Sequence, residues 1–148
     1  MDSLISRSEE ETERIARELA ESLSAGDVVY LVGDLGAGKT TFARGLAAGL
    51  GAVAREVASP TFAILHEYAA PGGKVVLRHL DLYRLADRAS ELDILGLPDA
   101  VAGAPIAVEW PGEAIRAALP PTVQVSLAAE SEDARRISIH RAPEKARS

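Results

Sequence analysis

The chain has 148 residues, about the length of one domain, and its 47% hydrophobic and 26% charged residues are typical of a soluble globular protein. It has no cysteine, which excludes disulfides, thiolate metal sites and thiol catalysis, and its net charge of −6 argues against unaided binding to nucleic acid. No apolar run approaches the roughly 20 residues of a membrane span, and the polar, acidic start is unlike a signal peptide, so we expect a cytoplasmic protein without membrane or DNA partners.

An amphipathic helix is predicted to begin after Ser8. Ser8 is suited to cap the helix, with Glu11 three residues further on, as in a capping box. Apolar residues then recur at a spacing of four and form one stripe on the helix: Ile15, Leu19 and Leu23. Gly26 stands where we expect the helix to stop.

A strand, a glycine-rich loop and a second helix follow in that order. Residues 28–32 form a continuous apolar run of β-forming residues, typical of a strand covered on both faces. The loop follows at once, and a helix rich in small residues is predicted over 41–50, closed by Gly51. This is the order in which a phosphate-binding loop is built.

The rest of the chain alternates between strand-like and helical patterns. We expect strands over residues 62–68, 74–82, 105–110, 122–127 and 135–139, and helices over 90–97 and 112–119. The turn signal at 71–73 joins the first two strands into a hairpin. Because no repeat or linker is visible, we expect a single α/β domain over residues 1–148, with a mixed, mostly parallel sheet flanked by helices.

The end of the chain is basic. Residues 134–148 contain five arginines and lysines against one glutamate, and we expect a frayed tail from about residue 141. Two interpretations stay open: a solubilising terminus, or a contact with RNA or an acidic partner.

Residues 33–40, GDLGAGKT, match the pattern G-x-x-x-x-G-K-[ST] at every fixed position. Glycines leave room for backbone N–H groups to surround phosphate oxygens, and the positive end of the following helix faces the same phosphates. We expect Lys39 to reach the β and γ phosphates and the Thr40 hydroxyl to ligate Mg²⁺. The motif therefore predicts a P-loop NTPase domain that binds a nucleoside triphosphate with Mg²⁺. Its predicted nucleotide contacts are Gly33, Asp34, Gly36, Ala37, Gly38, Lys39, Thr40 and Thr41.

Further candidate residues stand at strand ends and in one loop. Asp81 and Glu109 each end an apolar strand, where ligands gather in α/β sheets, so either carboxylate is a candidate for Mg²⁺; the alternative is a cap or a surface salt bridge. Thr61 lies in a loop where it could sense the γ-phosphate, although it could equally be an ordinary loop residue. Trp110, next to Glu109, is a candidate for core or subunit packing.

Several segments together closely resemble the TsaE family, also called YjeE. These segments are GDLGAGKTTFARGL, SPTF, HLDLYRL, ELDILGL and VEWP, between residues 33 and 111. The stretch SEEET before the first helix is also similar, and the resemblance covers about residues 8–128. It implies a bacterial cytosolic ATPase, slow by itself, that is needed for threonylcarbamoylation of the adenosine beside the anticodon of certain tRNAs. It also implies TsaB- and TsaD-type partners, of which TsaD performs the transfer, so that tRNA is contacted only through the complex.

The resemblance implies roles for individual residues as well. Thr40 and Glu109 would ligate Mg²⁺, and Asp81 would be the Walker B-type acid. Thr61 would belong to a switch loop and Trp110 would lie near the nucleotide. The predicted catalytic residues are then Lys39, Asp81, Glu109 and Thr61, and the acidic Glu9 would approach the nucleotide base.

Two other functions remain open from the sequence. A small-molecule kinase on this fold would need a lid with arginines, for which residues 84–88 (RLADR) are the candidate segment. A nucleotide-gated binding module would hydrolyse ATP only incidentally. The preference for adenine rests on the resemblance, because the chain has no guanine-reading N-K-x-D motif.

Overall fold

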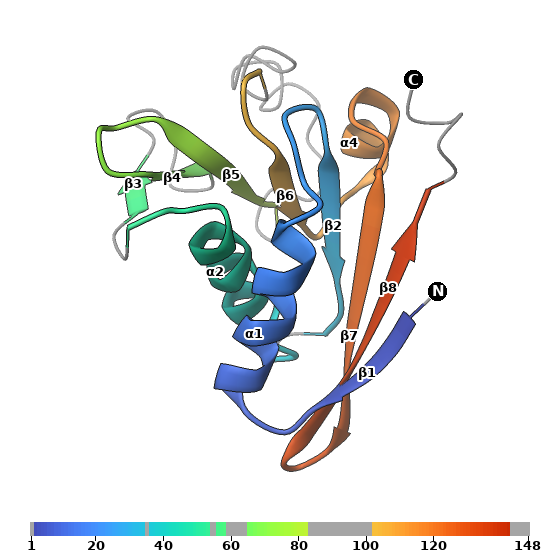
Figure 1. Ribbon diagram of the computed structural model, residues 1–148. Coiled ribbons are helices and arrows are strands. Elements are labelled where there is room, and N and C mark those ends of the chain that lie inside the picture. Colours follow the sequence, from blue (N-terminus) through green and yellow to red (C-terminus); the bar gives the residue numbers. More distant parts are fainter. Residues whose placement is uncertain (1, 35, 54–55, 59–64, 83–101, 143–148) are drawn as a thin grey trace.

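One eight-stranded sheet organises the chain in this computed structural model, which describes residues 2–34, 36–53, 56–58, 65–82 and 102–142 (Figure 1). The strand order is β1-β8-β7-β2-β6-β5-β4-β3. The strands are β1 (Asp2–Ser6), β2 (Val28–Val32), β3 (Glu56–Ala58), β4 (Leu65–Ala69), β5 (Val75–Asp81), β6 (Ile106–Glu109), β7 (Val123–Ser131) and β8 (Ala134–Arg141). The helices are α1 (Glu9–Ala20), α2 (Lys39–Gly49) and α4 (Glu113–Ala118).

The sheet is mixed, as predicted, but the expectation that it is mostly parallel is wrong, because three of the seven strand pairs among the described residues are parallel and four are antiparallel. Its four central strands, β7, β2, β6 and β5, pair in parallel. Antiparallel pairs extend both sides, β8 and β1 beyond β7, and β4 and β3 beyond β5. The β4–β5 pair confirms the predicted hairpin, and β6, β7, β8 and α4 confirm the late elements. The helix predicted over residues 90–97 lies outside the described residues.

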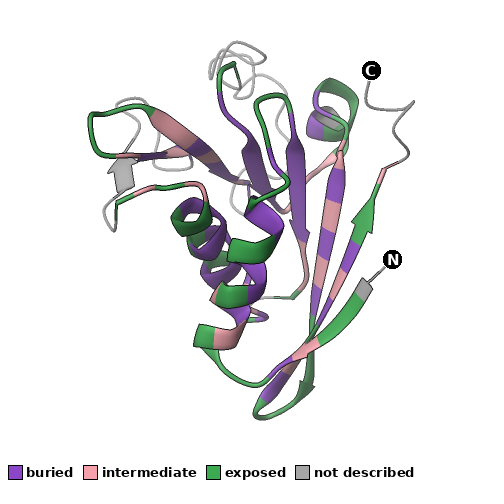
Figure 2. Ribbon diagram, viewed as in Figure 1, coloured by how far each residue is buried: buried purple, intermediate pink, exposed green. Residues whose placement is uncertain are grey.

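Helices cover both faces of the sheet (Figures 1 and 2). The core on the side of α1 and α2 includes Val29 and Leu31, whereas the core on the side of α4 includes Val28 and Tyr30. All four of these β2 residues are buried, which confirms the prediction of a strand covered on both faces. The strand β2 is thus packed on both faces up to its carboxyl end, where the glycine-rich loop begins.

The helices α1 and α2 pack unusually close together because α2 carries glycines at the contact. A Cβ atom at Gly45 would lie 2.6 Å from Cβ of Ala16, and one at Gly49 would lie 2.7 Å from Cβ of Ala20. Any larger side chain at either glycine would push the helices apart. The contact holds α1 beside α2, whose first residues carry the site.

The first helix begins as predicted but ends earlier. Ser8 caps it by accepting a hydrogen bond from the backbone N–H of Glu11. The prediction that the helix continues to Gly26 is wrong, since α1 ends at Ala20. Leu23 still packs in the core, but from the turn that reverses the chain into β2. Because Leu23 is buried four residues after Leu19, the sequence pattern wrongly predicted one more helical turn.

The edge strand β1 was not predicted, whereas its neighbour β8 covers the strand that we expected over residues 135–139. β1 pairs antiparallel with β8, with Leu4 opposite Ile137. Residues 134–141 form a strand between β7 and β1, and the frayed tail expected from about residue 141 falls mostly on residues 143–148, which lie outside the described residues. A strand of five residues at a chain end carries too little alternation to be recognised without its partner.

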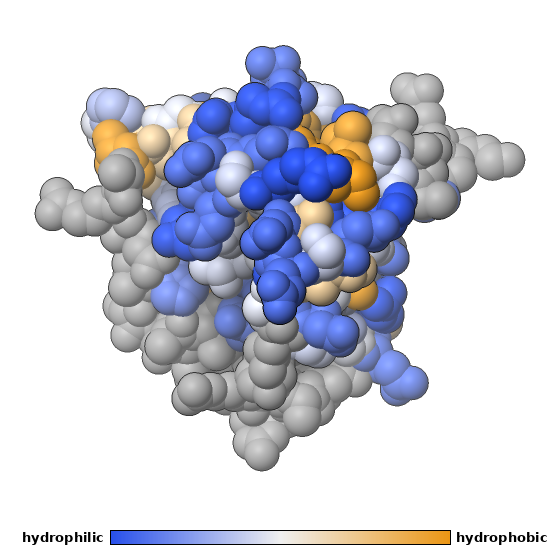
Figure 3. All heavy atoms as spheres, turned by 90° about the horizontal axis from the view of Figure 1, so that it is seen from below, coloured by the Kyte–Doolittle hydropathy of each residue, from blue (hydrophilic) through white to orange (hydrophobic). Residues whose placement is uncertain are grey.

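The surface seen in Figure 3 is mostly hydrophilic, with separate small hydrophobic areas. Over the described ranges, Leu4 and Val53 are the large hydrophobic residues that are exposed, and such single residues are ordinary on a protein surface. None of the helices that the structure describes is long and apolar enough to cross a membrane.

Candidate functional site

The glycine-rich loop connects the carboxyl end of β2 to the first residue of α2. Its glycines are required by geometry. Gly38, the residue that caps α2, has φ 105°, a left-handed conformation that favours glycine. At Gly33 a Cβ would lie 2.3 Å from the backbone oxygen of Leu127 in β7, so the loop can pass β7 only without a side chain. The loop is therefore held close to the sheet with the N-terminus of α2 open toward the pocket.

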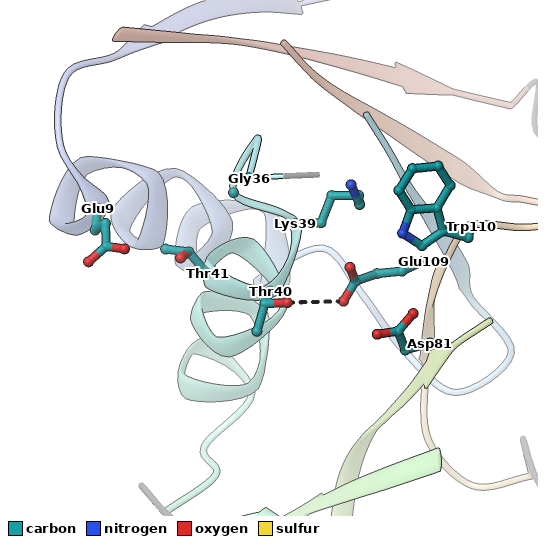
Figure 4. Close-up of a pocket in the computed structure, with 9 residues that line it drawn as sticks. Glu9, Gly36, Lys39, Thr40, Thr41, Asp81, Glu109 and Trp110 are labelled. Atoms are coloured by element: carbon teal, nitrogen blue, oxygen red, sulfur yellow. Dashed lines mark hydrogen bonds between the residues drawn. The ribbon is translucent and has the colours of Figure 1, made fainter. Parts of the chain in front are cut away.

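A pocket of about 300 Å³ lies at this helix end (Figure 4). The residues that line it come from α1, the loop and α2, β5 and β6: Glu9, Gly36, Gly38, Lys39, Thr40, Thr41, Asp81, Glu109 and Trp110. Every one of these residues was a sequence-predicted site residue. Of the other predicted loop contacts, Ala37 is buried in the core, and Gly33 and Asp34 line a separate pocket behind Trp110. Thr61 and the lid candidate 84–88 lie outside the described residues.

Lys39 is buried and its ammonium group is held by its own loop. Nζ donates hydrogen bonds to the backbone oxygens of Gly33 at 2.5 Å and Asp34 at 2.8 Å. It also lies 4.4 Å from the ring centroid of Trp110, a cation–π contact. Burial lowers the pKa of Lys39 below its ordinary value, an effect that the nearby charge of Glu109 opposes. A phosphate group entering the pocket would supply the full negative charge that this buried cation lacks.

Two carboxylates stand side by side at the carboxyl ends of parallel strands. Asp81 of β5 and Glu109 of β6 are register partners, so both side chains leave the same face of the sheet. Glu109 is buried, and its Oε2 accepts a hydrogen bond from the Thr40 hydroxyl at 3.4 Å (Figure 4). The sequence interpretation that these residues lie near the phosphate loop is confirmed for both, and the alternative of a surface salt bridge does not fit the buried Glu109.

The set of oxygen atoms around Thr40 fits Mg²⁺. A hydroxyl and two carboxylates are the hard oxygen ligands that this ion prefers, and it is commonly bound by one or two carboxylates together with substrate phosphates. Among the described residues, no group of three or more histidine or acidic side chains is arranged to hold a metal ion without such help. The arrangement therefore suits an ion that arrives with a polyphosphate.

Trp110 adopts a strained backbone conformation at the end of β6. Its φ of 59° is the only positive value among the described residues other than glycine. Such strain persists where surrounding contacts over-determine the conformation, commonly at functional sites. Here the indole ring packs partly against the core on the α4 side and partly against Lys39. The interpretation of Trp110 as a packing residue therefore holds in part, and its place beside a nucleotide stays a prediction.

Sequence reasoning missed His79, which reaches the same carboxylate from β5. His79 Nε2 and Glu109 Oε2 are 2.5 Å apart, and both side chains are 5% exposed. Two signals were available: His79 is the first residue of the segment HLDLYRL that carries part of the family resemblance, and it stands two residues before Asp81, where alternate residues of a strand share a face. That spacing could not reveal that β6 is the neighbouring strand.

A second pocket of about 280 Å³ shares Glu9, Gly36, Gly38 and Thr41 with the first. It continues away from Lys39 along α1 and the β7–β8 turn, where it is lined by Arg7, Glu132, Asp133 and Arg135 among others. Arg135 also donates a hydrogen bond from Nη2 to the backbone oxygen of Gly36 at 3.4 Å. Residues of the glycine-rich loop and of α1 and α2 thus border two neighbouring cavities, one lined by Lys39 and the two carboxylates and the other by side chains of both charges.

Comparison with known proteins gives consistent results. Residues 6–137 match the family described as threonylcarbamoyl adenosine biosynthesis protein TsaE. A Treponema pallidum protein named tRNA threonylcarbamoyladenosine biosynthesis protein TsaE is 41% identical over 137 residues, 91% of this chain and 97% of the relative. A protein of the same name from Bacillus subtilis is 47% identical over 102 residues, 68% of this chain and 61% of the relative. The crystal structure of Bacillus subtilis YdiB is similar with a TM-score of 0.70 and 32% identity, covering 97% of this chain and 87% of that one.

Proposed function

The chain belongs to the TsaE family, and from this premise we propose that it is a Mg²⁺-dependent ATPase required for the threonylcarbamoyladenosine modification of tRNA. The observation that carries the proposal is the meeting of Lys39, Thr40 and Glu109 in one pocket at the start of α2. A buried cation and a hydroxyl from adjacent residues and a carboxylate from a distant strand border a space at a helix N-terminus, which is the arrangement that phosphoryl transfer requires.

The chemistry is hydrolysis: a water oxygen attacks the γ-phosphorus in line with the bond to the bridging oxygen of the β-phosphate, that bond breaks to release ADP, and the proton lost by the water ends on the released phosphate or in solvent. Backbone N–H groups of the loop and the N-terminus of α2 stabilise the polyphosphate, since both direct positive charge toward it. Lys39 changes partners from the backbone oxygens of Gly33 and Asp34 to the phosphates, where its charge stabilises the transition state. Because its side chain already stands in the pocket, little rearrangement is needed before the reaction.

Thr40 and Glu109 would hold Mg²⁺ directly, and Asp81 would act beside them through water. When bound, the ion neutralises charge that develops on the β and γ phosphates. The hydrogen bond of Thr40 to Glu109 supports this assignment, because it brings the two oxygen ligands together before the ion arrives. Asp81 is half-buried, and because it would not ligate the ion directly, it is a better candidate than Glu109 for orienting the attacking water.

The nucleoside would extend into the second pocket. Glu9 and Thr41 line both cavities, so a ligand with its phosphates at Lys39 can continue past them. This agrees with an approach of Glu9 to the base, and adenine is the base that the family resemblance favours.

The partners we propose are TsaB- and TsaD-type proteins, with the transfer itself performed by the TsaD-type protein and tRNA contacted through the complex. The protein would act in the cytoplasm. Hydrolysis by the isolated chain should be slow, because no arginine is among the described residues that line the pocket around Lys39. A partner would accelerate it by ordering the site or by adding a charge.

The test is tRNA modification reconstituted with purified TsaB- and TsaD-type proteins, with this chain, without it, and with Glu109→Gln. We expect sustained modification only with the unchanged chain and ATP, together with release of phosphate. Equal modification without the chain would refute the proposal. Full modification by a Glu109→Gln protein that binds ATP but does not hydrolyse it would favour the binding module, and a phosphorylated small molecule would favour the kinase.

A further inference from the structure

We propose that His79 is a positioning residue for Glu109: the N–H of its Nε2 fixes the Glu109 carboxylate in the orientation that faces Thr40, and thereby sets the affinity for Mg²⁺. This inference rests on the function proposed above and deepens it. No part of the sequence motif around the phosphate loop contains His79, since the residue lies on β5 and acts across to β6.

The contact between the two side chains is short and almost free of solvent. The distance from Nε2 to Oε2 is 2.5 Å, and both side chains are 5% exposed. A carboxylate can only accept, so Nε2 carries the hydrogen. The same Oε2 accepts from Thr40 at 3.4 Å, and neither contact uses Oε1. Oε2 of Glu109 thus accepts hydrogen bonds within the protein, while Oε1 is left to ligate a metal ion.

The orientation of the His79 ring is set by the β4–β5 hairpin. Tyr68 of β4 stacks on the ring, with centroids 6.5 Å apart and planes inclined by 26°. His66, the register partner of His79, lies on the same hairpin with its ring centroid at 6.2 Å. The imidazole is therefore part of a packed aromatic group, and its Nε2 stays directed at β6.

Glu109 needs such a partner because another charge competes for it. Lys39 is close enough that Glu109 raises its pKa against the effect of burial. A carboxylate released from His79 would lower its energy by turning toward this buried ammonium group. Both side chains would then neutralise each other, and neither would be oriented for a phosphate or for Mg²⁺. The hydrogen bond from His79 prevents this arrangement.

The variants that test the inference differ by one methylene group. His79→Gln places an amide N–H close to the position of Nε2 and should keep the bond to Glu109. His79→Asn carries the same amide on a shorter side chain and should lose it. Leu77→Val, on the same face of the same strand, is the control for a loss of packing without any contact to Glu109. His79→Met, of similar volume but without a donor, is a second disrupting variant if the asparagine protein does not fold.

The measurement is ADP binding by calorimetry at increasing Mg²⁺ concentration, on proteins whose fold is checked by circular dichroism. Loss of an outer partner of a metal ligand typically weakens metal affinity about 10- to 100-fold. We expect His79→Asn to raise the half-saturating Mg²⁺ concentration at least 10-fold, with His79→Gln and Leu77→Val near the unchanged protein. In a Glu109→Gln background, replacing His79 should have no further effect, because the two residues act as one unit.

An unchanged half-saturating Mg²⁺ concentration in His79→Asn would overturn the inference. So would the finding that His79→Asn raises this concentration by the same factor in the Glu109→Gln protein as in the unchanged protein. Either result would leave the proposed function intact as long as the unchanged protein binds ADP in a Mg²⁺-dependent manner. Absence of that binding would refute the proposed function itself, so the two failures are distinguishable.

Discussion

Replacing Lys39 by methionine is the most direct perturbation of the proposed nucleotide site. The two side chains have similar length and volume, so the change removes the charge and the N–H donors while it keeps most of the packing. In the free protein Nζ bonds to two backbone oxygens and lies over Trp110. In the proposed nucleotide complex, these contacts would be replaced by charge-assisted hydrogen bonds to phosphate.

The size of the effect follows from this exchange of partners. A hydrogen bond to a charged group contributes about 1.5–3 kcal/mol. On binding, Lys39 would gain such bonds to phosphate and lose its two bonds to the backbone oxygens of Gly33 and Asp34. The methionine variant should therefore lose binding free energy equal to about one hydrogen bond between a charged group and phosphate. Because about 1.4 kcal/mol corresponds to a factor of ten, we expect the ATP affinity to fall roughly 10- to 100-fold.

Calorimetric titration with ATP and Mg²⁺ measures this loss directly. The matched control is Lys74→Met, the same substitution at an exposed position before β5 and outside the pocket. The control should bind ATP as the unchanged protein does. The reasoning is refuted if Lys39→Met binds ATP with unchanged affinity, or if Lys74→Met loses as much.

Three further outcomes are expected. The single tryptophan, Trp110, should change its fluorescence when ATP or ADP is added, because it lines the pocket beside Lys39; constant emission at saturating nucleotide would contradict this. Burial lowers the pKa of Lys39 from its ordinary value of 10.5, and only the charged form attracts phosphate. As the pH is raised, ATP affinity should therefore begin to fall before pH 10.5 is reached, and Lys39→Met should not show this fall. Gly45→Val should lower the free energy of unfolding in urea by about 1–3 kcal/mol, because its Cβ would lie 2.6 Å from that of Ala16. The control Ala48→Val, exposed on the same helix, should cost clearly less.

The sequence was most informative where function depends on a local backbone shape. The apolar run at 28–32 predicted the strand, the glycines of 33–40 the loop, and the small residues of 41–50 the helix, because each pattern is a property of neighbouring residues. Asp81 and Glu109 were predicted from their positions at strand ends. The carboxyl ends of parallel strands lie at one edge of a sheet, so the two acids were expected near each other. The structure confirms this, because Asp81 of β5 is the register partner of Glu109 of β6.

Local patterns misled where an element depends on a distant partner. Leu23 continued the apolar spacing of α1 although the helix ends at Ala20, since a buried leucine in a turn has the same spacing as one in a helix. The strand β1 pairs with β8 from the other end of the chain, so its five residues gave no local signal that predicted a strand.

The sequence by itself determined the phosphate loop, the α/β class and the acids at the strand ends, because each is encoded in short stretches of neighbouring residues. Tertiary structure alone decided that His79 bonds Glu109, that Lys39 lies over Trp110, and that Glu9 borders both cavities. The physical reason is that these contacts depend on strand order and on the close approach of α1 to α2. Both result from packing the whole chain around one sheet, so no single segment contains the information.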